Sequence, residues 1–137
     1  MSRPVFRPDR VPRMGDVPAD DPQAAYEALI DDLVSRTPAL SARLLRERSV
    51  VGMPEEDRAV NAIVARLSEE EREALAAFLE RERAGAFHDV LAAFTEWSDG
   101  GLGRSYQGKQ LCVGYEGGLH QDYVGRRMGW EWPPRGR

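Results

Sequence analysis

The chain has 137 residues, of which 42% are hydrophobic and 31% charged, and its formal net charge at pH 7 is −4. A chain of this size buries enough apolar surface to form a core without help from a metal, and it is too apolar to be disordered as a whole. Cys112 is the only cysteine, which excludes an internal disulfide and a zinc site built from four cysteines.

The sequence contains no membrane-spanning segment of roughly 20 apolar residues and no signal-peptide core after Met1. We therefore expect a soluble cytoplasmic protein. The charge is uneven, because residues 21–97 hold sixteen acidic residues against nine arginines. Nucleic-acid binding draws its affinity from clustered cations, so this acidic body argues against it.

Residues 1–20 predict an extended arm, because four prolines recur where a helix would need backbone donors: Pro4, Pro8, Pro12 and Pro18. Four arginines are interspersed with them: Arg3, Arg7, Arg10 and Arg13. Two interpretations are open for the arm. It binds an acidic partner, or it is a loose tail that lies on the chain's own acidic face.

Two helices are predicted over the next 28 residues. Asp20 or Asp21 caps the first helix, and Pro22 fits its first position. Its apolar residues follow helical spacing: Ala25, Tyr26, Leu29, Ile30, Leu33 and Val34. Thr37 and Pro38 end this helix and begin a second one over residues 38–48.

A third helix is predicted from Pro54, with an apolar stripe made of Ala59, Val60, Ile63, Val64 and Leu67. Ser68 and Glu71 have the spacing of a capping box, which begins a fourth helix. That helix keeps one apolar stripe as far as Trp97, so we expect a single long helix with Gly85 as the place for a kink, and a break at Gly85 is the alternative. We expect its apolar side chains to face the core.

The pattern changes after Gly101. Alternating residues predict two short strands around a turn at residues 107–109, and Leu119 to Arg127 are either a short helix or extended. The predicted fold is mainly α, a four-helix orthogonal or antiparallel bundle with a small C-terminal β-hairpin and tail. We expect residues 21–137 to form a single domain.

Catalytic spacings are not evident. His88 lies at the edge of the long helix's stripe, and a metal centre would need it to meet His120, with Asp122 or Glu116 completing the ligands. Sequence alone does not show that convergence, so we predict no catalytic residues, no cofactor and no metal. Cys112 lies between apolar neighbours and is expected to be a packing residue.

The C-terminal segment combines residue types that dominate protein interfaces. The candidate binding surface consists of His120, Asp122, Tyr123, Arg126, Arg127, Trp130 and Trp132. The alternative is a lid, in which the two tryptophan rings cover the core and Asp122 is fixed by an arginine.

Two stretches carry a resemblance to a family. They are "FHDVLAAF" (residues 87–94) and "LHQDYVGRRMGWEWP" (residues 119–133), the second with an Asp-aromatic-Val-x-Arg run before a Trp-Pro element. They resemble a small bacterial family of uncharacterised helical proteins over residues 25–133. The resemblance implies a helical domain and no particular activity, and the additional Trp130 and the N-terminal arm depart from the family's pattern.

Two functions from different classes follow from these observations. The first is a noncatalytic protein-interaction or regulatory module, with a protein partner or a homodimer formed through the long helix or the tail. The second is a small enzyme or small-molecule binder with a site near His88, His120, Asp122 and Arg126.

Overall fold

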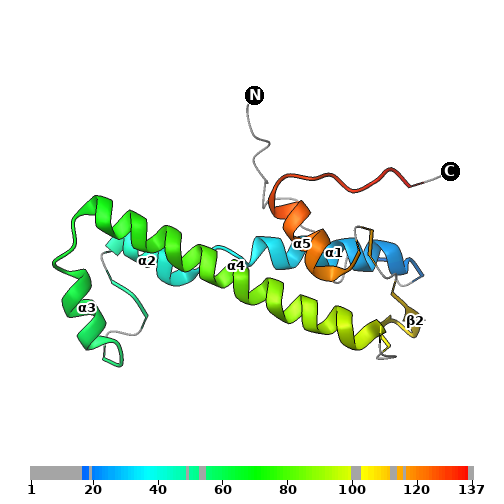
Figure 1. Cartoon of the computed structure of the whole chain (residues 1–137), viewed down its shortest axis with the longest axis horizontal. Helices are drawn as coiled ribbons and strands as arrows, with labels where there is room; N and C mark the ends of the chain where they lie inside the picture. Colours follow the sequence, from blue (N-terminus) through cyan, green and yellow to red (C-terminus); the bar gives the residue numbers. More distant parts are fainter. Residues whose placement is uncertain are drawn as a thin grey trace. The chain divides into compact units, whose positions relative to one another are not determined.

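The computed structural model describes residues 17–18, 20–48, 50–52, 55–99, 103–111, 114–115 and 117–135. These residues are mainly helical with one small hairpin, which confirms the predicted fold class. In chain order the elements are α1 Pro22–Ser35, α2 Leu40–Arg48, α3 Arg58–Val64, α4 Glu69–Asp99, β1 Ser105–Tyr106, β2 Lys109–Gln110 and α5 Leu119–Arg127 (Figure 1). None of the described helices combines the length and apolar character that crossing a membrane requires.

The chain divides into two compact units, each with its own apolar core. One unit contains residues 1–35 and 87–137, and the other contains residues 36–86. The core of the first consists of Tyr26, Ile30, Val34, Leu91, Leu119 and Tyr123, and that of the second consists of Ala42, Leu45, Val51, Val64 and Ala76. The sequence predicted one shared interior, whereas the described residues form two clusters. A single domain over residues 21–137 stays a prediction.

In the first unit, α1 and α5 pack side by side (Figure 1). The α1 helix begins where predicted, because the Asp21 carboxylate accepts a hydrogen bond from the Ala24 amide at 2.8 Å. Tyr26 and Ile30, four residues apart on one face of α1, are fully buried. Ala25 and Val34 of the predicted α1 stripe are buried too, but Leu29 is 41% exposed, so most of the stripe faces a core and Leu29 does not.

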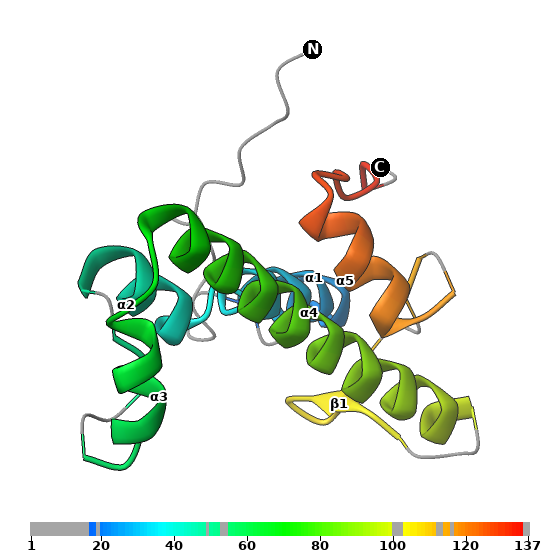
Figure 2. The same cartoon turned by 60° about the vertical axis from the view of Figure 1, so that its left-hand side comes forward.

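In the second unit, α2 and α3 precede the first turns of α4 (Figure 2). The α3 helix is shorter than predicted, since it begins at Arg58; Pro54 lies outside the described residues. Val64 is buried, but Val60 and Ile63 are 45% and 53% exposed, so the predicted α3 stripe is only partly in the core. A seven-residue helix has two turns and buries little more than one apolar position here.

The α4 helix begins at the predicted capping box. The Ser68 hydroxyl accepts from the Glu71 amide at 3.2 Å, and the Glu71 carboxylate accepts from the Ser68 amide at 2.7 Å. The helix then runs for 31 residues without a break at Gly85. The prediction of one long helix is confirmed.

Replacing Gly85 with alanine is expected to raise the free energy of unfolding by about 0.5–1 kcal/mol. Gly85 lies inside α4, and a Cβ atom added there would meet nothing within 4 Å. The substitution therefore removes backbone freedom from the unfolded chain without a clash. Urea unfolding checks this, and a destabilised Gly85→Ala variant would show that the helix is not regular there.

The hairpin turn is found where predicted, but its strands are shorter. Ser105 pairs with Gln110 and Tyr106 with Lys109, around a two-residue turn. Gln107 and Gly108 have φ angles of 49° and 77°, the left-handed pair that a tight hairpin of this type requires. The Tyr106 hydroxyl donates to the Val17 carbonyl, which ties the hairpin to the segment before α1.

Candidate functional site

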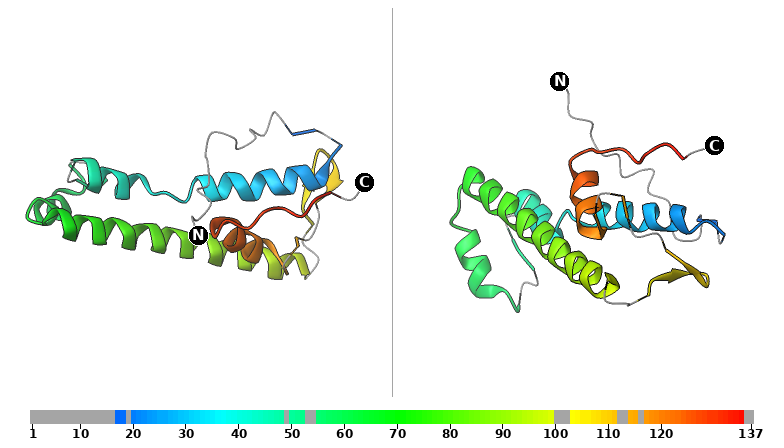
Figure 3. Two further views of the ribbon diagram at one scale, coloured as in Figure 1. Left: turned by 90° about the horizontal axis from the view of Figure 1, so that it is seen from above. Right: turned by 45° about the vertical axis from the view of Figure 1, so that its right-hand side comes forward.

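A glycine turn at the end of α5 directs the C-terminal tail. Gly129 has a φ of 89°, the Trp130 amide donates to the Gly125 carbonyl, and the Gly129 amide donates to the Arg126 carbonyl. This pattern is a Schellman motif, which ends a helix and reverses the chain. The tail then runs back along α1, as Figure 3 shows.

Asp122 of α5 is fully buried and is held by polar groups of two other segments. Its Oδ2 accepts the Tyr26 hydroxyl proton at 2.6 Å and the Tyr115 amide proton at 2.9 Å. Gly114 makes this approach possible, because a Cβ atom there would lie 2.8 Å from the Tyr26 hydroxyl. Asp122 therefore joins α1, α5 and the chain before α5 from inside the core.

The two tail tryptophans belong to an aromatic cluster on α1. The Trp132 ring centre lies 6.2 Å from that of Tyr26, 5.5 Å from Tyr115 and 5.2 Å from Trp130. The Trp132 indole N–H also donates to Asp31 at 3.0 Å. These contacts support the lid interpretation of the tail.

Arg126 completes this cluster. Its guanidinium donates to Asp31 at 2.6 Å and to the Trp130 carbonyl at 2.5 Å, and it lies 5.2 Å above the Trp132 ring. Asp31 thus accepts from both Arg126 and Trp132, which fixes both on α1. The lid interpretation expected an arginine, Arg126 or Arg127, to fix Asp122, whereas the carboxylate that pairs with Arg126 is that of Asp31.

The predicted surface residues are therefore divided between interior and exterior. Asp122 and Tyr123 are fully buried, Arg126 is mostly buried, and Arg127 is exposed with its guanidinium 5.8 Å from the Tyr123 ring centre. A ligand at this surface would contact Arg127, His120 and the exposed edges of the two tryptophan rings. It would not reach the buried Asp122 carboxylate. Binding by this segment stays a prediction.

His88 and His120 do converge. Their ring centres are 5.3 Å apart with the ring planes nearly perpendicular, although 32 positions separate them in the chain. Nδ1 of His88 lies 3.2 Å from Asp89, and Nδ1 of His120 lies 3.4 Å from the Thr95 hydroxyl. Two acids were predicted to complete a metal site with these histidines. Of these, Asp122 accepts hydrogen bonds from Tyr26 and Tyr115, and Glu116 lies outside the described residues.

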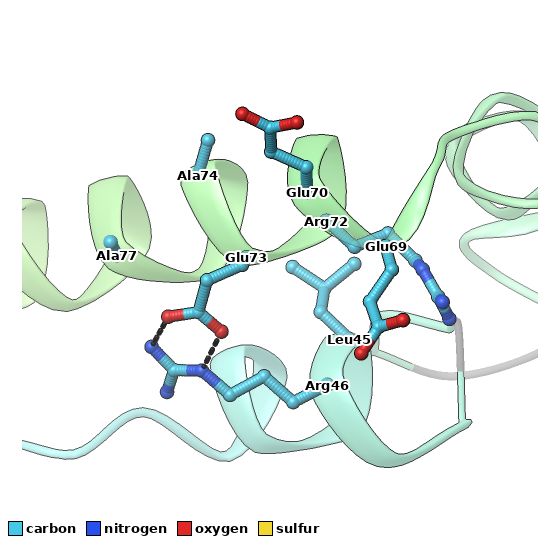
Figure 4. Close-up of a pocket in the computed structure, with 8 residues that line it drawn as sticks. All are labelled: Leu45, Arg46, Glu69, Glu70, Arg72, Glu73, Ala74 and Ala77. Carbon is cyan, nitrogen blue, oxygen red and sulfur yellow. Dashed lines mark hydrogen bonds and ion pairs between the residues drawn. The ribbon is translucent and has the colours of Figure 1, made fainter.

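A groove of about 700 Å³ in the second unit was not predicted from the sequence. It lies between α2 and the start of α4 (Figure 4), and Arg46 forms a fork there with Glu73 at 2.7 Å and with Glu80 at 2.7 Å. The groove is lined by Leu45, Arg46, Glu69, Glu70, Arg72, Glu73, Ala74 and Ala77. Arg46 of α2 thus binds two carboxylates of α4, and these ion pairs link the two helices beside the groove.

Acidification is expected to destabilise the protein through Asp21 and Glu73. The hydrogen bond from the Ala24 amide, supported by Arg135, lowers the pKa of Asp21, and the hydrogen bond from Arg46 lowers the pKa of Glu73. Because both pKa values are depressed in the folded state, the stabilisation is complete at neutral pH and is lost as the pH falls through the folded values.

Urea midpoints measured at neutral pH and at successively lower pH check this expectation. The double variant Asp21→Asn and Glu73→Gln carries no ionisable group at either position, so its midpoint should fall less steeply on acidification. Parallel pH curves for the variant and the unmodified chain would contradict it.

The second half of α4 carries an exposed apolar surface that sequence reasoning placed in the core. Val90 is 54% exposed, Phe94 48% and Trp97 69%, and Ala93 between them is exposed too. We call these four residues the α4 apolar face. Leu91 is buried, and Trp97 lies six positions further on, about 120° around the helix. The helix thus has two apolar faces, and the prediction of one was wrong.

The described residues include no group of three or more His, Cys, Asp and Glu side chains able to hold a metal. No curated protein and no solved structure matches the chain. The family that does match is described as "Family of unknown function (DUF6547)", and it covers residues 19–134. The chain belongs to this family, whose function is unknown.

Proposed function

We propose that this protein is a noncatalytic interaction module that pairs with a second copy of itself through the α4 apolar face. The observation that carries the proposal is the exposure of Val90, Phe94 and Trp97 on one side of one helix. Large apolar side chains that share an exposed face typically mark contact surfaces.

The size of the face suits a helix-to-helix contact. The exposed parts of Phe94 and Trp97 amount to on the order of 250 Å² of aromatic surface per chain. Two copies contribute roughly 500 Å², and flanking residues of the same helices add the rest of a modest interface. Tryptophan is also the residue type most enriched among interface residues that dominate binding.

The spacing along α4 fits a pair of antiparallel helices related by a two-fold axis. An axis midway between Ala93 and Phe94 places Val90 of one copy opposite Trp97 of the second copy. The small Ala93 at the centre lets the helices approach closely. A self-complementary patch of this kind is what a two-fold dimer needs.

The acidic residues beside the face do not oppose one another in this register. Asp89 lies level with Ser98 of the second copy, and Glu96 lies level with Leu91, whose side chain is buried in its own chain. Like charges directly opposite would disfavour the pair, so their offset supports a second copy as the occupant. Residues 84–99 contain no lysine or arginine, so the apolar contact carries the association.

Light scattering on the untagged full chain over a range of concentrations tests the proposal. We expect a dimer at high concentration and at least a tenfold weaker dimer for Trp97→Ser. Met128→Ser is the matched control, because Met128 is 81% exposed but lies after α5. A monomer at every concentration, or equal effects of the two substitutions, would refute it.

Deleting residues 1–18 tests whether the N-terminal arm, and not a second copy of α4, covers the α4 apolar face. The arm carries four arginines and is a candidate to cover an acidic helix. A dimer that survives the deletion supports pairing through α4. A dimer that is lost on deletion but unaffected by Trp97→Ser would assign the contact to the arm instead.

A small-molecule binder is the second candidate function, and the convergence of His88 and His120 favours it. The other two predicted site residues are engaged with other side chains, Asp122 with the buried Tyr26 and Arg126 with the partly buried Asp31. Thermal melts of the full chain with a ligand library, repeated with His120→Ala, test this candidate. A melting temperature that no compound raises would remove its support.

A further inference from the structure

The hydrogen bonds around His120 determine which of its ring nitrogens carries the proton. The Thr95 hydroxyl has one proton, which it donates to the Leu91 carbonyl at 2.9 Å. The same oxygen accepts the Leu119 amide proton at 3.2 Å. It can therefore only accept from the His120 ring, so Nδ1 of His120 is the donor and Nε2 carries the lone pair.

His88 is held in the same tautomer. Its Nδ1 lies 3.2 Å from an Asp89 carboxylate oxygen, which can only accept. Nδ1 of His88 is thus the donor, and its Nε2 also carries a lone pair. Isolated histidine side chains favour the opposite tautomer, with the proton on Nε2, so this arrangement is imposed by the neighbours.

We propose that His88 and His120 bind one divalent transition-metal ion through their Nε2 atoms. Histidine ligands of metals almost always donate their other ring proton to a carboxylate or another oxygen, as both do here. Two imidazoles at about 2.1 Å from one ion, in tetrahedral geometry, have ring centres roughly 5 Å apart. The observed separation is 5.3 Å.

The ligand set determines the kind of ion and the strength of binding. Imidazole nitrogens suit Zn²⁺, Ni²⁺ and Cu²⁺ and not Mg²⁺ or Ca²⁺. The described residues offer no third His, Cys, Asp or Glu ligand, so water or an added donor is expected to fill the other positions. Such a site keeps open positions, as catalytic and exchangeable metal sites do, and is weaker than a closed structural one.

Titration calorimetry of the untagged full chain with Zn²⁺, and separately with Ni²⁺, tests the proposal. We expect one ion per chain. For either His88→Asn or His120→Asn we expect the dissociation constant of the metal to be at least tenfold larger. Glu70→Gln is the control, because Glu70 is an exposed acid on the same helix and should not affect binding. Equal metal affinities for the unmodified protein and all three variants would overturn the proposal.

Imidazole ¹⁵N NMR gives a second readout that does not depend on affinity. The chain has only two histidines, so two ring systems are observed. We expect both rings to be protonated on Nδ1 before metal is added, and one equivalent of Zn²⁺ to shift both Nε2 signals together. A shift of only one ring, or Nε2–H tautomers in both, would also overturn it.

Discussion

Replacing Asp122 with alanine is expected to lower the free energy of unfolding by about 3–5 kcal/mol. The side chain is fully buried, and one of its oxygens accepts from the Tyr26 hydroxyl and the Tyr115 amide. Hydrogen bonds to a charged group contribute about 1.5–3 kcal/mol each, and the substitution removes two and leaves a cavity. Urea unfolding followed by circular dichroism measures the loss.

Two variants separate the hydrogen bonds from the packing. Tyr26→Phe keeps the ring and removes one donor, so it should cost about 1–2 kcal/mol. Asp122→Asn keeps the shape of the side chain and one acceptor oxygen. Its loss in the free energy of unfolding should therefore lie between those of Tyr26→Phe and Asp122→Ala. If Asp122→Ala lowers the free energy of unfolding by less than about 1 kcal/mol, the Asp122 carboxylate is not a major source of this unit's stability.

Replacing Trp132 with alanine is expected to lower the free energy of unfolding by about 3 kcal/mol. Truncating a large aromatic residue in a core costs about 3–5 kcal/mol, and the lower end applies because Trp132 is only partly buried. The ring contacts Tyr26, Tyr115 and Trp130, and its indole N–H donates to Asp31. The substitution also removes the surface over which the Arg126 guanidinium lies.

Glu131→Ala is the matched control for this truncation, because Glu131 is the exposed residue between the two tryptophans. It should change the free energy of unfolding by less than about 0.5 kcal/mol. Equal losses for Trp132→Ala and Glu131→Ala would contradict the lid interpretation, since the tail would then not be packed on α1.

Local signals predicted the helices well. Asp21, Ser68 and Glu71 are helix-start residues whose hydrogen bonds form within one turn, so their effect does not depend on the rest of the fold. The prediction that α4 continues through Gly85 is confirmed, although the single apolar stripe on which it rested is two faces in the structure. The turn at Gln107 and Gly108 was likewise located from neighbouring residues.

Long-range features were not predictable in the same way. Asp31 accepts from Arg126 and Trp132, about one hundred positions away, and nothing in the sequence distinguishes it from Asp32 beside it. Helical spacing shows which residues share a face but not which face is covered. Phe94 and Trp97 were therefore assigned to a core from which the structure leaves them exposed.

Disulfide trapping of Ala93→Cys tests the central claim, that two copies pair through α4, most directly. The variant is made with Cys112→Ser, so that the introduced thiol is the only one in the chain. A thiol beside a two-fold axis lies near its own counterpart, so mild oxidation should link two copies rapidly. Met128→Cys in the same background should remain largely monomeric. If Ala93→Cys forms linked dimers no faster than Met128→Cys while both variants are folded, the α4 apolar face is not where two copies meet.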